Sequence, residues 1–229
     1  MKNIYLSKNV IPAAAEYLEH KGWNISIISG ASHLKTHISS HPDIYMCKLG
    51  VMDEAPVFFG DPDRLGDRYP ADVPYNAACT GKYFIHNLKY TDEKLLDYAR
   101  SLDLILIDIR QGYSKCSIAV IDENSVITSD EGAAKVLKAS GLDVLTIRKG
   151  HIKLPGYDYG FIGGTCGRAG NEIIFNGDLT RHPDCQLITE FIGSKGLAIK
   201  YFEGYELEDI GSIISDTKPC QEDFINIIK

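Results

Sequence analysis

The 229-residue sequence has no apolar run approaching the roughly 18 residues of a membrane-spanning helix, so we predict no membrane partner. Its first residues, Met1–Asn9, are too polar for a secretory signal peptide, and we expect a cytoplasmic protein. The six cysteines are widely scattered and no pair has metal-ligand spacing, which favours reduced thiols. With 31 acidic and only 24 basic side chains, the formal net charge of -7 argues against direct binding to nucleic acid.

Several catalytic and cofactor motifs are missing too. The sequence has no HExxH, paired CxxC or histidine cluster for a metal, no GxxxxGK[ST] for phosphate and no GxSxG nucleophile motif. We therefore predict neither a cofactor nor a metal. The content of 44 % hydrophobic and 24 % charged residues is ordinary for a globular protein, and it excludes disorder, collagen and a coiled coil.

The sequence does contain an internal repeat. Residues 116–130 predict two strands joined by a turn, and residues 131–141 and 142–147 predict a helix and a third strand. Ser129 is expected as the N-cap of that helix and Gly141 as the residue that ends it. The unit is therefore strand, strand, helix and strand, over roughly 40 residues.

The same unit recurs along the chain. Its hairpin, helix and closing strand are predicted at 75–87, 91–101 and 102–109, and again at 159–178, 183–193 and 197–202. An earlier segment, 47–61, has the length of 116–130 and also ends in an acidic residue after an apolar strand. The residues that follow it, 62–74, are rich in proline, glycine and aspartate, so we predict a long loop in place of its helix.

A fifth unit is split between the two ends of the chain. Residues 3–29 predict a strand, a helix and a strand, and residues 210–215 supply the missing first strand, with a tail helix over 221–228. Such units cannot bury their apolar faces singly, and stacking them round an axis does so. We therefore predict one domain, residues 1–229, with an α/β fold of five units in a ring closed between the termini. An open doubly wound sheet is the alternative, but it would lack the hairpins.

Three short motifs accompany this pattern. They are PADVPYNA at 70–77, the tripeptide HPD at 41–43 and again at 182–184, and the glycine-rich segment 149–164. With the five units, they resemble the pentein, or α/β-propeller, fold of the guanidino-group modifying enzymes, which translation initiation factor six shares. The resemblance suggests an uncharacterised bacterial branch of this superfamily, and it places Asp72 at the position of the family's substrate-binding aspartate.

The resemblance implies a cysteine nucleophile in the fifth unit and a histidine in the third. The corresponding stretch 208–213 has Ser212 and no cysteine, and the stretch 110–116 has no histidine. Catalysis would therefore need a rearranged pair, for which Cys116 and His151 of neighbouring units are the candidates. The competing interpretation is that Cys116 is a small buried core residue.

Four aspartates enter the first strands of their units at comparable places, and tyrosines lie beside them. The predicted ligand-binding residues are Asp43, Asp72, Tyr113, Asp158 and Asp209, with Tyr157 and Tyr159 as further ring-forming candidates. A cluster of carboxylates and aromatic rings suits a small planar cation such as a guanidino or amino-acid-like ligand. The alternatives are a Cys/His-dependent amidinohydrolase or amidinotransferase, a ribosome-binding factor resembling initiation factor six, and a structural or oligomerising protein.

Overall fold

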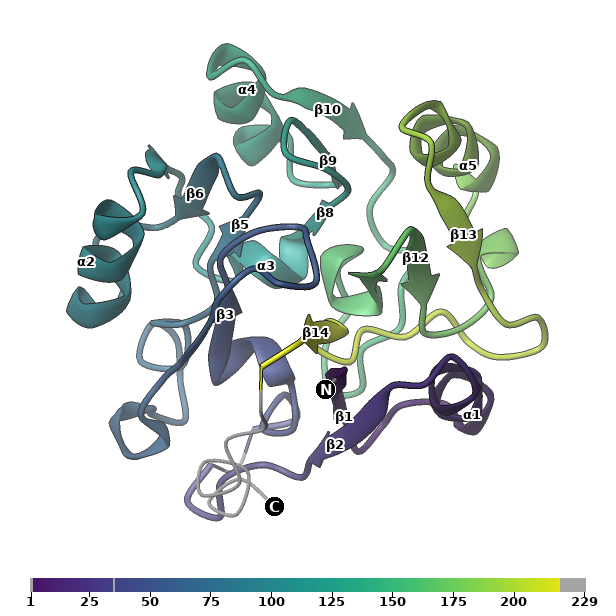
Figure 1. Ribbon diagram of the computed structural model, residues 1–229, viewed down its shortest axis with the longest axis horizontal. Coiled ribbons are helices and arrows are strands. Elements are labelled where there is room, and N and C mark those ends of the chain that lie inside the picture. Colours follow the sequence, from purple (N-terminus) through teal and green to yellow (C-terminus); the bar gives the residue numbers. More distant parts are fainter. Residues whose placement is uncertain (1, 35, 219–229) are drawn as a thin grey trace.

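The computed structural model describes residues 2–34 and 36–218, and it has a mixed α/β fold with five small sheets (Figure 1). The predicted tail helix over 221–228 lies outside the described residues. Within the described part, no helix combines the length and the apolar character needed to cross a bilayer.

Three sheets have the predicted order of strand, strand, helix and strand, in which an antiparallel hairpin is followed by a helix and a parallel third strand. The first comprises β5 (Ala78–Cys79), β6 (Tyr83–His86), α2 (Glu93–Ser101) and β7 (Ile105–Asp108). The second comprises the one-turn helix α3 (Ser114–Ser117), β8 (Ile118–Val120), β9 (Ser125–Thr128), α4 (Glu131–Ala139) and β10 (Asp143–Thr146). The third comprises β11 (Cys166–Ala169), β12 (Glu172–Phe175), α5 (Cys185–Ser194) and β13 (Ala198–Lys200).

The fourth sheet joins the two ends of the chain. It contains β14 (Ile214–Asp216), β1 (Asn3–Ser7), α1 (Pro12–His20) and β2 (Asn24–Ile28). Strand β14 is antiparallel to β1, with Ile4 opposite Ser215, and β1 is parallel to β2. The predicted pairing of an N-terminal with a C-terminal segment is therefore confirmed.

Strand β14 is shorter than the strand predicted over 210–215. Gly211 and Ser212 have φ angles of 71° and 74°, in the left-handed region that an extended strand excludes. The backbone N–H groups of Ile210 and Ser212 both donate to the carbonyl oxygen of Gly164, at 3.0 and 2.9 Å. This segment therefore forms a tight turn against Gly164 before the strand begins.

The fifth sheet has only two strands, β3 (Met46–Lys48) and β4 (Val57–Phe59), which pair antiparallel. The helix expected to be missing here is indeed absent among the described residues: the 3₁₀ turn η2 (Pro62–Arg64) and irregular backbone occupy the connection to β5. This agrees with the predicted long loop at 62–74.

The ends of helix α4 test the predicted caps. Its N-cap is Asp130, one residue beyond the predicted Ser129, because the Asp130 carboxylate accepts from the Ala133 backbone N–H at 2.9 Å. Gly141 has a φ of 91°, the left-handed conformation predicted for the residue that ends this helix.

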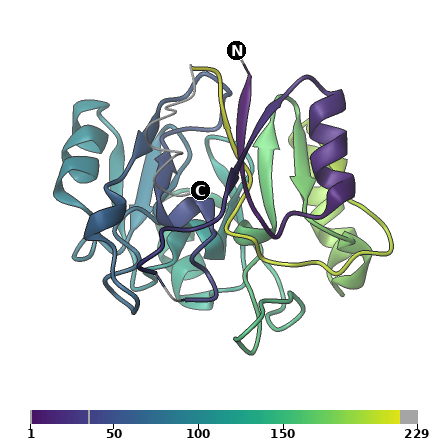
Figure 2. The same cartoon turned by 90° about the horizontal axis from the view of Figure 1, so that it is seen from below.

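Helices α1, α2, α4 and α5 lie at the periphery, and the sheets lie inside them (Figure 1). Contacts link the first strands in sequence order, from β3 to β5, β8, β11 and β14. Three short turns precede these strands, namely η1 (Pro42–Ile44), α3 and η3 (Gly163–Thr165). The loop between β10 and η3 protrudes from one face (Figure 2). The turns and this loop together position the candidate site.

Candidate functional site

A cavity of about 300 Å³ brings together side chains from segments far apart in the sequence. We call it the acidic cavity; its polar and aromatic lining includes His41, Tyr113, Cys116, Tyr157, Asp158 and Asp209. Tyr157, with 49 % of its surface exposed, and the exposed Asp158 come from the protruding loop. His41, Cys116 and Asp209 are each at most 4 % exposed. The cavity therefore has an open mouth and a buried end.

The buried end is organised around the fully buried carboxylate of Asp43. Its Oδ2 accepts from the Cys116 thiol at 2.9 Å and from the Ser212 hydroxyl at 2.8 Å, and its Oδ1 accepts from the Asn76 amide at 2.9 Å. We call these four side chains the Asp43 network. The Ser212 hydroxyl also lies 2.9 Å from the carbonyl oxygen of Gly163. The Asp43 network and this carbonyl therefore bring together one segment from before the first strand of each of the five sheets.

Asn76 holds Cys116 in place. The Asn76 amide oxygen accepts from the backbone N–H groups of Lys115 and Cys116, at 2.9 and 3.3 Å, at the beginning of the four-residue helix α3. The amide nitrogen lies 3.4 Å from the Cys116 sulfur. Asn76 therefore contacts both the backbone and the side chain of Cys116.

The surroundings of the Cys116 thiol favour its protonated form. Burial raises its pKa well above the ordinary value, and the neighbouring carboxylates of Asp43 and Asp209 raise the pKa further. A thiolate is the nucleophilic form of cysteine, so this environment lacks a preformed nucleophile. A cation entering the cavity would act in the opposite direction and lower the thiol pKa.

Asp209 is the second buried carboxylate of the cavity. Its oxygens accept from the backbone N–H groups of Phe161 and Gly211, at 2.9 and 3.0 Å. Burial raises its pKa, and the hydrogen bonds and His41 oppose that shift. His41 Nδ1 lies 3.8 Å from Asp209 Oδ1, and this ring nitrogen is buried without a hydrogen-bond partner.

Asp72 and Tyr113 form a pair beside the cavity. The Tyr113 hydroxyl donates to Asp72 Oδ2 at 2.7 Å, whereas Asp72 Oδ1 is buried and has no partner. Burial raises the pKa of Asp72, although the hydrogen bond from Tyr113 lowers it. Tyr69 packs on Tyr113 with ring centroids 5.8 Å apart, which adds a second aromatic face.

This pair predicts a stability change in Asp72→Asn. Because the folded pKa of Asp72 is raised, ionisation disfavours the fold as pH rises through that pKa. The neutral amide removes the buried charge while its oxygen still accepts from Tyr113. We expect the free energy of unfolding at pH 7 to rise by about 1 kcal/mol.

Urea denaturation at pH 7 and pH 4 measures this change. The advantage of Asp72→Asn should shrink at the lower pH, where the wild-type carboxyl becomes protonated. Asp97→Asn is the matched control, because Asp97 is exposed and pairs only with exposed Arg100 on α2. A variant that is destabilised at pH 7 would contradict the assignment of a desolvated carboxylate.

The structure brings together most of the predicted site residues, with one clear exception. Tyr113, Cys116, Asp158 and Asp209 line the acidic cavity, Tyr157 and Tyr159 line it too, Asp43 lies at its end and Asp72 contacts Tyr113. His151 is not brought to Cys116: it is exposed, packs on His182 with ring centroids 5.5 Å apart, and lines a separate hollow with Arg148 and Asp184.

Sequence reasoning missed His41, Asn76 and Ser212 as parts of one site. His41, the first residue of an HPD tripeptide, precedes η1. Its ring also lines the cavity. The repeated tripeptide HPD and the motif PADVPYNA marked these positions, but spacing along the chain could not show that their side chains meet.

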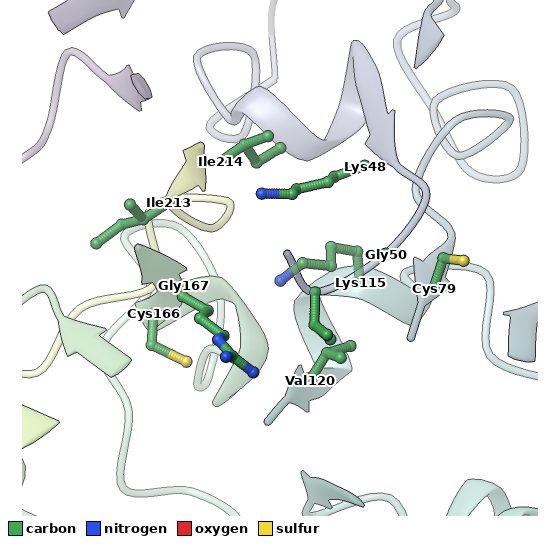
Figure 3. A pocket seen from close by; sticks show the side chains of 11 residues that line it. Lys48, Gly50, Cys79, Lys115, Val120, Cys166, Gly167, Ile213 and Ile214 are labelled. Carbon is green, nitrogen blue, oxygen red and sulfur yellow. The ribbon is translucent and has the colours of Figure 1, made fainter. Parts of the chain in front are cut away.

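A second, smaller hollow of about 40 Å³ is basic (Figure 3). The amines of Lys48 and Lys115 point into the space it encloses, and Arg168 also lines it. Burial lowers the pKa of Lys48 to about 8. Cys79 and Cys166 also line this hollow, and burial raises the pKa of Cys79 to about 12 and that of Cys166 to about 11. Neither of these two thiols lines the acidic cavity, whereas Cys116 does, so Cys116 is the cysteine of interest.

Comparisons with known proteins identify a family. Residues 53–214 match the model of a family described as "Family of unknown function (DUF6873)", so the chain belongs to that family. A search of curated proteins gave no significant match. A solved agmatine deiminase from C. jejuni, a cysteine-to-serine variant with substrate bound, is similar with a TM-score of 0.43 and 12 % identity. The match covers 64 % of this chain and 56 % of the deiminase, so the chain spans little more than half of that enzyme.

Proposed function

We propose that this protein is a pentein-like α/β-propeller, a single domain whose acidic cavity binds a small guanidino or amino-acid-like cation. The consecutive contacts of the first strands and the pairing of β14 with β1 support a ring that closes between the termini. Segments that precede all five sheets meet at the Asp43 network and the Gly163 carbonyl, which supports a position of the cavity on the axis of such a ring.

The observation that carries the ligand class is the charge of the cavity. Asp209 at its buried end and Asp158 at its mouth are acidic, and Asp43 lies directly behind Cys116. Among the described residues, no lysine or arginine lies within 4.0 Å of these three carboxylates. Asp43 and Asp209 are buried without a lysine or arginine partner, which favours a cationic ligand because an uncompensated buried charge is costly.

The aromatic lining favours a planar cation over a spherical one. Tyr113, Tyr157 and Tyr159 present rings to the cavity, and a guanidinium can stack on a ring face while its edge donates to a carboxylate. A guanidinium also carries five N–H donors, which suits the separated acceptors of Asp158 and Asp209.

Calorimetric titration with arginine, agmatine, creatine and methylated arginines tests the proposal. Because the Asp209 carboxyl has a raised pKa and the ligand needs its ionised form, binding should release a proton. We expect the affinity to increase with pH by up to about tenfold per pH unit until Asp209 is ionised in the free protein. Repeating the titration in buffers of different ionisation enthalpy measures how many protons are released on binding. The absence of heat with every compound would contradict the proposal.

One observation favours a second candidate function, a cysteine-dependent amidinohydrolase or amidinotransferase. A ring nitrogen of His41, a carboxylate oxygen of Asp43 and the Cys116 sulfur all lie within 4.8 Å of one another. A bound guanidinium would lower the pKa of the Cys116 thiol. His41, rather than the predicted His151, would then be the acid/base residue. Release of ammonia or urea from arginine or agmatine by the wild type, but not by Cys116→Ser, would establish this activity. The ribosome-binding alternative stays a prediction.

A further inference from the structure

The side chains of His41, Asp43 and Cys116 form a cluster with three different kinds of metal-ligating atom. One nitrogen, one oxygen and one sulfur from these residues all lie within 4.8 Å of one another, and all three residues are buried. They come from the turn η1, its preceding residue and the helix α3, which the Asp43 network holds in place. The cluster is therefore rigid, and its donor atoms already converge.

The state of His41 distinguishes this cluster from an ordinary hydrogen-bond network. Its Nδ1 is buried without a hydrogen-bond partner, although the residue is only 1 % exposed. Buried polar side-chain atoms nearly always have a partner, so an orphaned nitrogen at a cluster of acceptors points to a missing ligand. Asp209 Oδ1 lies 3.8 Å from the same nitrogen, beside the cluster.

The negative charge around the cluster also favours a cation that carries more than one positive charge. Asp43 and Asp209 are 0 % and 2 % exposed, and Asp43 Oδ2 accepts from the Cys116 thiol at 2.9 Å. The nearest cation in the network, Lys115, reaches Asp43 only through the Ser212 hydroxyl, to which its amine donates at 3.0 Å. Among the described residues, neither buried carboxylate has a lysine or arginine within 4.0 Å, and one divalent ion can balance the two.

We propose that His41, Asp43 and Cys116 bind a divalent transition metal of the zinc type, with Asp209 beside the cluster. Imidazole, thiolate and carboxylate are the ligands that zinc takes, whereas magnesium and calcium prefer oxygen alone. Binding converts the Cys116 thiol to a thiolate: the sulfur forms a bond to the metal, and its proton leaves to solvent. The absence of a sequence motif is explained by ligands that come from residues 41–43 and 116.

The metal and the organic cation would use the same carboxylates, so the two proposals are tested separately. Full-length protein is stripped with a chelator, dialysed, and titrated with Co²⁺ while its absorption spectrum is recorded. We expect a sulfur-to-cobalt charge-transfer band and the intense visible bands of a tetrahedral site. Zn²⁺ should bind to the same site, measured by the loss of the cobalt bands.

Variants assign the bands to this cluster. Cys116→Ser should abolish the charge-transfer band, and His41→Ala should weaken Zn²⁺ binding by more than about 100-fold, the upper range for outer-shell partners. Cys166→Ser is the matched control, because Cys166 is also buried but lines the basic hollow. No cobalt bands in the wild type, or unchanged bands in folded Cys116→Ser, would overturn the metal site. Either result leaves the calorimetric test with guanidino compounds unaffected.

Discussion

Gly164→Ala is expected to lower the free energy of unfolding by roughly 3 kcal/mol, as overpacking at a buried polar contact does. A Cβ atom at this position would collide with the Asp209 carboxylate. The backbone cannot move aside easily, because the Gly164 carbonyl accepts from both Ile210 and Ser212. The variant should therefore displace Asp209 from the cavity and loosen the turn before β14.

Urea denaturation followed by circular dichroism measures this loss. Gly193→Ala is the matched control, since Gly193 lies in α5, is exposed, and has no atom within 4 Å of an added Cβ. That variant should gain about 0.5–1 kcal/mol through helix propensity. Equal stability of Gly164→Ala and the wild type would show that the contact between Asp209 and Gly164 does not hold the site together.

Asp209→Asn is expected to weaken the binding of a guanidino cation by roughly 100-fold, or about 3 kcal/mol. The amide lacks the negative charge. Its oxygen can accept only one of the two hydrogen bonds that the carboxylate accepts from the N–H groups of Phe161 and Gly211, so the other is lost. The pH dependence of binding should disappear with the carboxyl group, because no proton is then released.

Titration calorimetry of both proteins at the same pH measures this change. Asp97→Asn, which removes the same charge from the exposed face of α2, should bind as tightly as the wild type. An equal loss of affinity in the two variants would show that binding depends on the net charge of the protein and not on Asp209. Circular dichroism of Asp209→Asn separates a binding loss from a failure to fold.

The order of elements could be predicted because local signals determine it. Gly141 ends α4 in a left-handed conformation, and the cap of the same helix was displaced by only one residue, from Ser129 to Asp130. Where tertiary contacts decide, the prediction was wrong: residues 210–213 were expected to begin a strand, but the N–H groups of Ile210 and Ser212 bond to Gly164 and that of Gly211 bonds to the Asp209 carboxylate.

The site was predictable in part for the same reason. Cys116 and Asp209 were found because the repeat marks where each first strand is expected to begin. Cys116 begins the first of the two strands predicted over 116–130, but in the structure it lies in α3, before β8. His41 was missed because its partner Asp209 lies at the other end of the chain, and no local signal reports a contact of that kind. His151 follows a glycine at a strand end, as a functional histidine would, but its loop directs it to a different hollow.

One calorimetric titration shows whether the acidic cavity recognises a planar cation. Chelator-treated protein is titrated by calorimetry with agmatine and with the urea analogue of agmatine, in which a carbonyl oxygen replaces one guanidino nitrogen and the charge of that group is lost. We expect agmatine to bind and the urea analogue to bind at least about tenfold more weakly, because it cannot form a charge-assisted pair with a carboxylate. Equal affinity for the two compounds, or no binding of either, would contradict it.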